Sequence, residues 1–316
     1  MRKAGLLLVG CLLGTACGAF PRQSGAVPAF APSPPGAVRQ HQLPPGTTCR
    51  LAYADISEAT GGFIYYPGGE RQSDPSATVA LPGNTPGMVG MNPGLSYVPS
   101  IKTWYPVPRA WVAPDGGWYV YEDFKNFQIK AAGTAAGTSG FVTNTGGWQI
   151  IGTVAGGVFL SRIGSPGAWS FAFGQEPEQV VDHGNWQALY GGALWAIDST
   201  GTLLRHDVAT GGETVAATGL FAGSEVVGLD ASGDPIVSTG GALAIYHSGG
   251  LRTTVWPGTG GLSQSGWVVE DGHGIWFEVA GGLVGAPDHG VYLWTPEHGA
   301  TLVSAPEVHV AGPCEP

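Results

Sequence analysis

Residues 270–277 read Glu-Asp-Gly-His-Gly-Ile-Trp-Phe, a turn that contains Asp and Gly followed directly by a run of β-branched and aromatic residues. Residues 113–120 (Ala-Pro-Asp-Gly-Gly-Trp-Tyr-Val) and 230–237 (Asp-Ala-Ser-Gly-Asp-Pro-Ile-Val) have the same arrangement. A short turn with Asp and Gly between two apolar segments is the signal for a tight β-hairpin, because Gly adopts positive φ without steric cost. These stretches therefore predict strand–turn–strand units.

Similar apolar runs recur along the chain at a regular spacing. They begin at residues 63, 118, 158, 194, 235 and 275, so the first interval is 55 residues and the other four lie between 36 and 41. In several units a second hairpin follows, as in residues 203–215, 244–255 and 291–303. Two hairpins in about 40 residues form a four-stranded blade, which is the repeating unit of a β-propeller.

The amino-acid composition agrees with an all-β fold. The 316 residues include 54 glycines and 25 prolines, and only 11% of them are charged. Such a composition is unfavourable for helices and typical of short strands joined by tight turns. We therefore predict an all-β propeller of four-stranded blades over residues 47–316, with six blades favoured over five or seven. A pair of β-sandwiches and a β-helix are the alternatives, although their strands recur less regularly or over fewer residues.

Two cysteines lie at the two ends of the predicted propeller. Cys49 and Cys314 are the cysteines outside the N-terminal segment. In an exported protein such a pair is expected to form a disulfide. In a ring of blades this bridge would fasten the ends where the chain closes on itself.

The N-terminal segment has the features of an export signal. Basic residues at positions 2 and 3 precede an apolar stretch that ends at Ala16 and is too short to span a bilayer as a helix. Cys11 and Cys17 are both candidates for lipid modification, and we favour Cys17 because only about six apolar residues precede Cys11. A conventional signal peptide cleaved near Ala16 or Ala19, or an uncleaved anchor, is the alternative.

The sequence thus predicts a signal peptide with a lipobox over residues 1–17 and a Pro-rich linker over residues 18–46. We expect the protein to be exported and to lie in the cell envelope, lipid-anchored or extracellular, with contact to the membrane only through the lipid. The formal net charge of -10 and the lack of a dense Lys/Arg run argue against nucleic acid as a partner. We expect a monomer.

Several segments resemble known propeller families. Residues 113–120 resemble the Pro-Asp-Gly hairpin of WD40-like repeats in TolB-type propellers, and residues 198–211 are similar to blade motifs of NHL, SMP-30-like and quinoprotein-type propellers. Residues 61–76 are similar to the first blade of uncharacterised exported propeller lipoproteins of soil bacteria. These resemblances imply blades rather than an activity.

Four aspartates in turns are candidates for a ligand-binding rim. Asp115, Asp198, Asp230 and Asp271 lie at comparable places in successive units, and they would face one ligand if those turns lie at the same end of each blade. The alternative is that each carboxylate accepts hydrogen bonds within its own turn.

The eight histidines lack the His-x-x-x-His spacing that is typical of zinc sites, and we expect neither a metal nor another cofactor. Streptogramin-lyase-like propellers have a site that contains histidine. That comparison makes His183, His273 and His289 the histidines to test.

The sequence also lacks a nucleophile elbow, a phosphate-binding loop and a redox-cofactor motif. It therefore favours a non-enzymatic binding or scaffold protein that recognises a protein, peptide or glycan. The alternative is an extracytoplasmic propeller enzyme of the glycoside hydrolase, lactonase or lyase type. A cluster of Asp and His at the axis with shifted pKa values would favour that alternative.

Overall fold

The computed structural model describes residues 43, 46–55, 60–78, 94–123, 128–133, 143–144, 147–172, 175–258, 262–264, 267–281, 290–304 and 308–316. All of them belong to the second of two compact units, which divide the chain between Val38 and Arg39. The predicted signal peptide, Cys11, Cys17 and nearly all of the predicted linker lie outside the described residues. Within the described part, no helix is long and apolar enough to cross a membrane.

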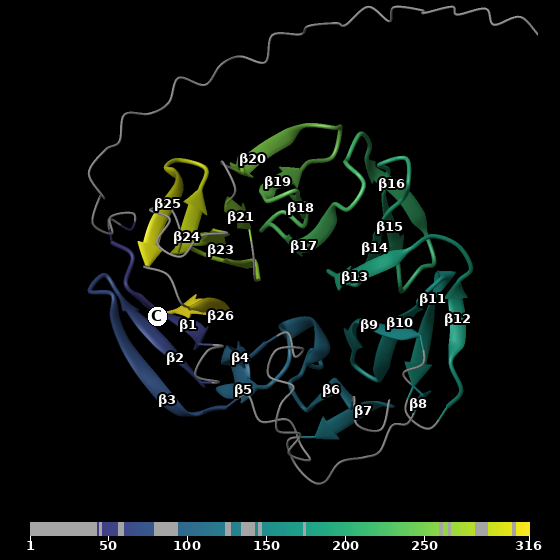
Figure 1. Ribbon diagram of the computed structural model, residues 1–316, viewed down its shortest axis with the longest axis horizontal. Helices are drawn as coiled ribbons and strands as arrows, with labels where there is room; N and C mark the ends of the chain where they lie inside the picture. The colour runs from purple at the N-terminus through teal and green to yellow at the C-terminus, as the bar shows by residue number, and fades with distance from the viewer. Residues whose placement is uncertain are drawn as a thin grey trace, which may run out of the picture. The chain divides into compact units, whose positions relative to one another are not determined.

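The described residues form an all-β structure, as predicted, in which the helical elements are two 3₁₀ turns, η1 (Pro99–Ile101) and η2 (Arg109–Trp111). The strands form seven antiparallel sheets, which we call sheets I to VII (Figure 1). Sheet I contains, in spatial order, β26 (His309–Glu315), β1 (Cys49–Asp55), β2 (Thr60–Tyr66) and β3 (Glu70–Thr78). Sheet II pairs β4 (Ser96–Val98) with β5 (Thr103–Tyr105). Sheet III contains β6 (Trp118–Asp123), β7 (Gln128–Gly133) and β8 (Thr143–Asn144).

The remaining sheets follow the chain. Sheet IV contains β9 (Trp148–Val154), β10 (Gly157–Arg162), β11 (Ser165–Ala172) and β12 (Glu178–Val181). Sheet V contains β13 (Trp186–Tyr190), β14 (Ala193–Ile197), β15 (Leu203–Asp207) and β16 (Glu213–Ala217). Sheet VI contains β17 (Glu225–Leu229), β18 (Pro235–Thr239), β19 (Ala242–Tyr246) and β20 (Arg252–Trp256). In sheet VII, β21 (Leu262–Gln264) and β22 (Val269–Asp271) both pair with β23 (Gly274–Gly281), followed by β24 (Gly290–Thr295) and β25 (Gly299–Ser304).

The inner strands of several sheets are buried on both faces. Every residue of β14 and of β24 is buried, whereas three of the four residues of β12 are exposed. Successive side chains of a strand point to opposite faces of the sheet. A strand that is covered on both faces therefore needs a continuous apolar run, such as residues 194–197. Both faces of these sheets are therefore covered by other parts of the chain.

Apolar clusters join each sheet to the next one along the chain. In one of them, Trp276 and Leu293 of sheet VII pack with Leu51 and Ile64 of sheet I. The clusters of the described residues connect sheets I and II, II and III, III and IV, IV and V, V and VI, VI and VII, and VII and I. Each sheet thus shares its core with two others.

The two ends of this unit meet in sheet I. Strand β26 pairs antiparallel with β1 (Figure 1). In this pairing Leu51 lies opposite Cys314. The predicted disulfide between Cys49 and Cys314 is present, with a Cα–Cα distance of 5.4 Å. The last described strand therefore completes the sheet that the first described strand begins.

The described residues form one sheet more than the six units predicted. The six predicted runs lie in or begin strands β2, β6, β10, β14, β18 and β23, and sheet II lies in the long first interval between residues 63 and 118. Its two strands have three residues each, and Lys102 rather than Gly adopts the left-handed conformation between them, with φ 53°. Sheet II thus lacks both the apolar run and the Asp-Gly turn on which the spacing depended.

Replacing both bridge cysteines, in the double variant Cys49→Ser/Cys314→Ser, is expected to lower the free energy of unfolding by up to about 5 kcal/mol. The bridge constrains the unfolded chain because it closes a loop with a sequence separation of 265 residues. Urea unfolding with and without dithiothreitol measures the effect. The reductant should destabilise the wild type and leave the variant unchanged. Equal midpoints for the oxidised wild type and the variant would contradict this prediction.

Candidate functional site

The four predicted rim aspartates do not occupy equivalent turns. In a four-stranded antiparallel sheet, the first and third turns lie at one end and the second turn lies at the other. Asp230 lies between the first two strands of sheet VI, and Asp271 ends β22 just before β23. Asp115 precedes β6 in a turn closed by a bridge between Val112 and Tyr119. Asp198, in contrast, lies in the second turn of its sheet, between β14 and β15.

Each of these carboxylates accepts a backbone hydrogen bond within its own turn, which was the alternative interpretation of the sequence. In each case the backbone N–H two residues further on donates to the carboxylate: Gly117 donates to Asp115 at 2.9 Å, Thr200 to Asp198 at 2.8 Å, Ser232 to Asp230 at 2.9 Å, and His273 to Asp271 at 2.8 Å. At Asp198, the Thr200 hydroxyl and the amides of Thr200 and Thr202 lower the pKa of the carboxyl group. These bonds stabilise the turns themselves.

Asp271 also makes contacts beyond its turn. Its second carboxylate oxygen accepts hydrogen bonds from Trp276 Nε1 at 2.8 Å and from the backbone N–H of Cys314 at 2.7 Å. Only 9% of its side chain is exposed. Asp271 therefore ties sheet VII to β26, next to the disulfide.

Carboxylates of sheets VI and VII lie close enough to repel one another electrostatically. Burial raises the pKa of Glu270, and the negative charges of Asp271 and Asp230 raise it further. Among the described residues, Lys and Arg form ion pairs with Glu315, Asp123 and Asp207, and with none of the carboxylates near Glu270. We call the group of Asp230, Asp234, Glu270 and Asp271 the acidic rim. It includes two of the four predicted rim aspartates.

Two histidines contact the acidic rim. His247 Nδ1 lies 2.7 Å from Asp234 Oδ2, and His273 Nδ1 lies 3.3 Å from Asp271 Oδ1. Asp230, Asp234 and His247 are also the group of described residues whose ligand atoms lie close enough to hold a metal ion, all within 4.8 Å of one another. His273 is one of the histidines predicted from the sequence, whereas Asp234 and His247 are not. These two residues are 13 positions apart and meet only when β18 and β19 pair.

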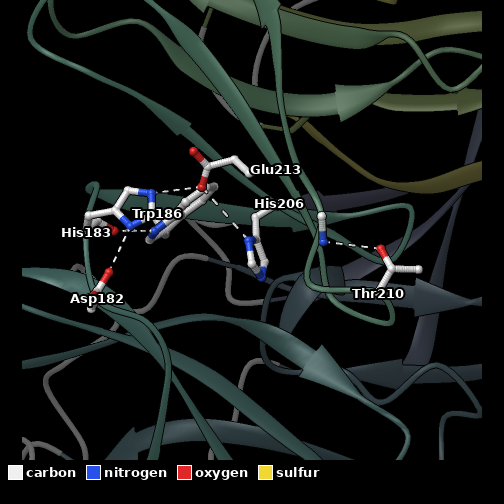
Figure 2. Close-up of polar contacts among 7 residues, drawn as sticks. Asp182, His183, Trp186, His206, Thr210 and Glu213 are labelled. Atoms are coloured by element: carbon white, nitrogen blue, oxygen red, sulfur yellow. Dashed lines mark hydrogen bonds and ion pairs between the residues drawn. The ribbon is translucent and has the colours of Figure 1, made fainter.

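A second polar cluster surrounds His183, in the connection between β12 and β13. Figure 2 shows its ring between two carboxylates: Nδ1 lies 3.0 Å from Asp182 and Nε2 lies 2.9 Å from Glu213 of β16. The same Glu213 oxygen lies 4.0 Å from His206 Nδ1. The indole N–H of Trp186 donates to the carbonyl oxygen of His183 at 2.7 Å.

The His183 cluster favours the charged imidazolium. The hydrogen bond to Asp182 raises the pKa of His183, the contact with Glu213 raises it further, and partial burial opposes both. Both ring nitrogens point at carboxylate oxygens, so neither nitrogen has a free lone pair with which to act as a general base. The cluster is suited to holding the connection against β16, although 56% of the His183 side chain is exposed.

A third contact pairs a buried carboxylate with a histidine from another sheet. The carboxylate of Glu278 in β23, with 5% of its side chain exposed, contacts the imidazole Nδ1 of His309 in β26. This pair again joins sheet VII to sheet I. His289, the remaining predicted histidine, lies outside the described residues.

No family model matches the chain, and no curated protein matches it. The sheets and these polar clusters are therefore the features that bear on function.

Replacing His183 with glutamine is expected to lower the stability at about pH 5.5, by less than about 1 kcal/mol because the site is largely exposed. The raised pKa means that the stabilisation is complete below the pKa of the unfolded chain and is lost as the pH rises through the pKa of the folded protein. The difference between wild type and variant should therefore shrink at about pH 8.5.

Urea midpoints at the two pH values measure this difference. The matched control is His298→Gln, because His298 contacts the Thr295 hydroxyl at 3.2 Å rather than a carboxylate. A His183→Gln difference that does not change with pH, or that grows as the pH rises, would refute the charged clamp.

Proposed function

We propose that the seven sheets are the blades of a closed β-propeller, and that this propeller is a non-enzymatic binding module of the bacterial cell envelope. The closure is supported by the apolar clusters, which join consecutive sheets and also join sheet VII to sheet I. It is further supported by β26, which completes sheet I from the other end of the chain. A closed propeller leaves only short, protected edges and presents its turns on a rigid support.

The acidic rim is the observation that carries the binding function. Four carboxylates, two at the turn between β17 and β18 and two in β22 of the adjoining sheet, lie without a Lys or Arg partner among the described residues. Such a group attracts cations, and the net charge of -10 extends the attraction over a longer range. We therefore propose that the ligand is a positively charged segment of a peptide or protein.

The groups that acid–base catalysis would need are already engaged. Both ring nitrogens of His183 contact carboxylates, and both oxygens of Asp271 accept hydrogen bonds. The raised pKa of Glu270 is the feature that suits an enzyme, since a glycosidase needs one carboxylic acid with a raised pKa. A glycoside hydrolase is therefore our second candidate function. A hydrolase would be shown by turnover of a glycoside substrate that is lost in Glu270→Gln.

The substitution Glu270→Gln is expected to weaken the binding of a fluorescently labelled oligolysine peptide by about threefold or more at low salt, because it removes one of four neighbouring charges. Fluorescence anisotropy measures the affinity. The matched control is Glu178→Gln, which removes the same charge from an exposed position of β12. The same loss in the control, or no binding by the wild type, would rule out the acidic rim as the binding site.

We also propose export and lipidation at Cys17. In a bacterial host supplied with a palmitate analogue, Cys17→Ser should lose the label and move to the soluble fraction. Cys11→Ser should keep the label and stay with the membranes. The reverse pattern would assign the lipid to Cys11, and no label in any form would contradict a lipoprotein.

A further inference from the structure

Two turns at one end of sheet VI bring Asp230, Asp234 and His247 together. The two aspartates bracket the turn between β17 and β18, and His247 follows β19 directly. Because β18 and β19 pair antiparallel, with Ile236 opposite Ile245, the start of β18 lies beside the end of β19. Residues that are 17 positions apart in the chain thus reach the same point.

The turn itself does not need the side chain of Asp234. Residues 230–234 and 198–202 form the same five-residue turn: in both, the first N–H donates to the fifth carbonyl oxygen, at 2.9 and 3.0 Å respectively. In both, the first Asp accepts from the fifth N–H, at 2.8 and 2.9 Å. Thr202 occupies the fifth position in one turn and Asp234 in the other. The Asp234 carboxylate is therefore available for another role.

The imidazole of His247 is oriented by a contact of the ring nitrogen that faces away from the aspartates. Its Nε2 lies 2.8 Å from the Thr253 hydroxyl, while its Nδ1 faces Asp234 Oδ2 at 2.7 Å. When Nε2–H donates a hydrogen bond to this hydroxyl, Nδ1 is the ring nitrogen that a metal ion beside the aspartates would bind. Outer contacts of this kind orient the histidine ligands of metal sites.

The surrounding charge favours a cation at this point. The negative charge of Asp230 reaches Glu270 of the neighbouring sheet. Burial raises the pKa of Glu270, and the charges of Asp271 and Asp230 raise it further. Among the described residues, no Lys or Arg side chain pairs with Asp230 or Asp234. A divalent ion would neutralise the two aspartates.

We propose that Asp230, Asp234 and His247 bind a divalent transition-metal ion, with Zn²⁺ as the best fit, through one oxygen of each carboxylate and the imidazole Nδ1. An imidazole nitrogen favours this class of ion over Mg²⁺ or Ca²⁺, which prefer oxygen ligands. The three atoms lie within 4.8 Å of one another, so small side-chain movements bring them to the zinc–ligand distance of about 2.0–2.2 Å. Any proton between His247 and Asp234 leaves as the ion binds.

Three protein ligands leave a fourth coordination position for water or an outside ligand. The inference rests on the proposed function in one respect, that the acidic rim is open to cations. Zinc binding is nevertheless measured separately from peptide binding. Loss of zinc binding alone would overturn this inference, whereas loss of oligolysine binding alone would overturn the proposed function.

Isothermal titration calorimetry of the full chain with ZnCl₂ tests the site. Cys11 and Cys17 are replaced by Ser in every sample, so that no free thiol competes for zinc. We expect one strongly bound ion per chain. Asp234→Thr, which copies the fifth residue of the turn at 198–202, and His247→Gln should each weaken binding at least tenfold. MgCl₂ should bind far more weakly.

The matched controls are His183→Gln, which alters another histidine–carboxylate cluster, and Asp198→Asn, which alters a turn with the same hydrogen bonds at the other end of a sheet. Both should retain zinc affinity within about twofold of the wild type, since neither supplies a ligand. Circular dichroism establishes that each variant keeps the β structure, and Asp234→Thr provides the test even if His247→Gln fails to fold. No zinc binding by the wild type, undiminished binding by Asp234→Thr, or an equal loss in the controls would overturn the proposal.

Discussion

The pairing of β26 with β1 is the constraint on which the rest of the structure depends. It places the last described strand of the chain beside the first, and the Cys49–Cys314 bridge fixes that register covalently. Without β26, the β1 edge of sheet I would expose unpaired backbone groups. The apolar cluster between sheets VII and I would also lose Val310. Local hairpins build each sheet, and this long-range pairing joins the first and the last described strands.

Polar contacts reinforce the same junction. The carboxylate of Asp271 accepts hydrogen bonds from the indole of Trp276 and from the backbone of Cys314, and it is nearly buried where it does so. The contact between the buried Glu278 carboxylate and the His309 imidazole also joins sheet VII to β26. A buried carboxylate that loses its hydrogen-bond donors is costly, so these contacts disfavour an arrangement in which β26 leaves sheet I.

The parts of the fold that follow from local sequence were predictable. Apolar runs after Gly-rich turns located a strand in six of the seven sheets, and the position of two cysteines near the ends of the domain predicted the disulfide. Sheet II was not predictable in this way. Its strands are too short to show alternation, and Lys102 takes the left-handed turn position that Gly usually occupies. The six-unit estimate was therefore one sheet short.

The candidate sites were predictable only where one turn contains all the necessary residues. The bonds of Asp230 to its own turn follow from the Asp-x-x-Gly pattern. The contacts of His247 with Asp234, and of His183 with Glu213, depend on which strands pair and how far each side chain reaches. Single-sequence spacing does not contain that information, because partners 13 and 30 residues apart meet only after the sheets form.

Native-state hydrogen exchange of the backbone amides in residues 309–315 tests the central claim most directly. If β26 is an integral strand of sheet I, the amides that bond to β1 should exchange as slowly as those of β14. They should remain protected when the disulfide is replaced by two serines. Exchange of these amides at the rate of an unstructured chain, in either form, would contradict the account.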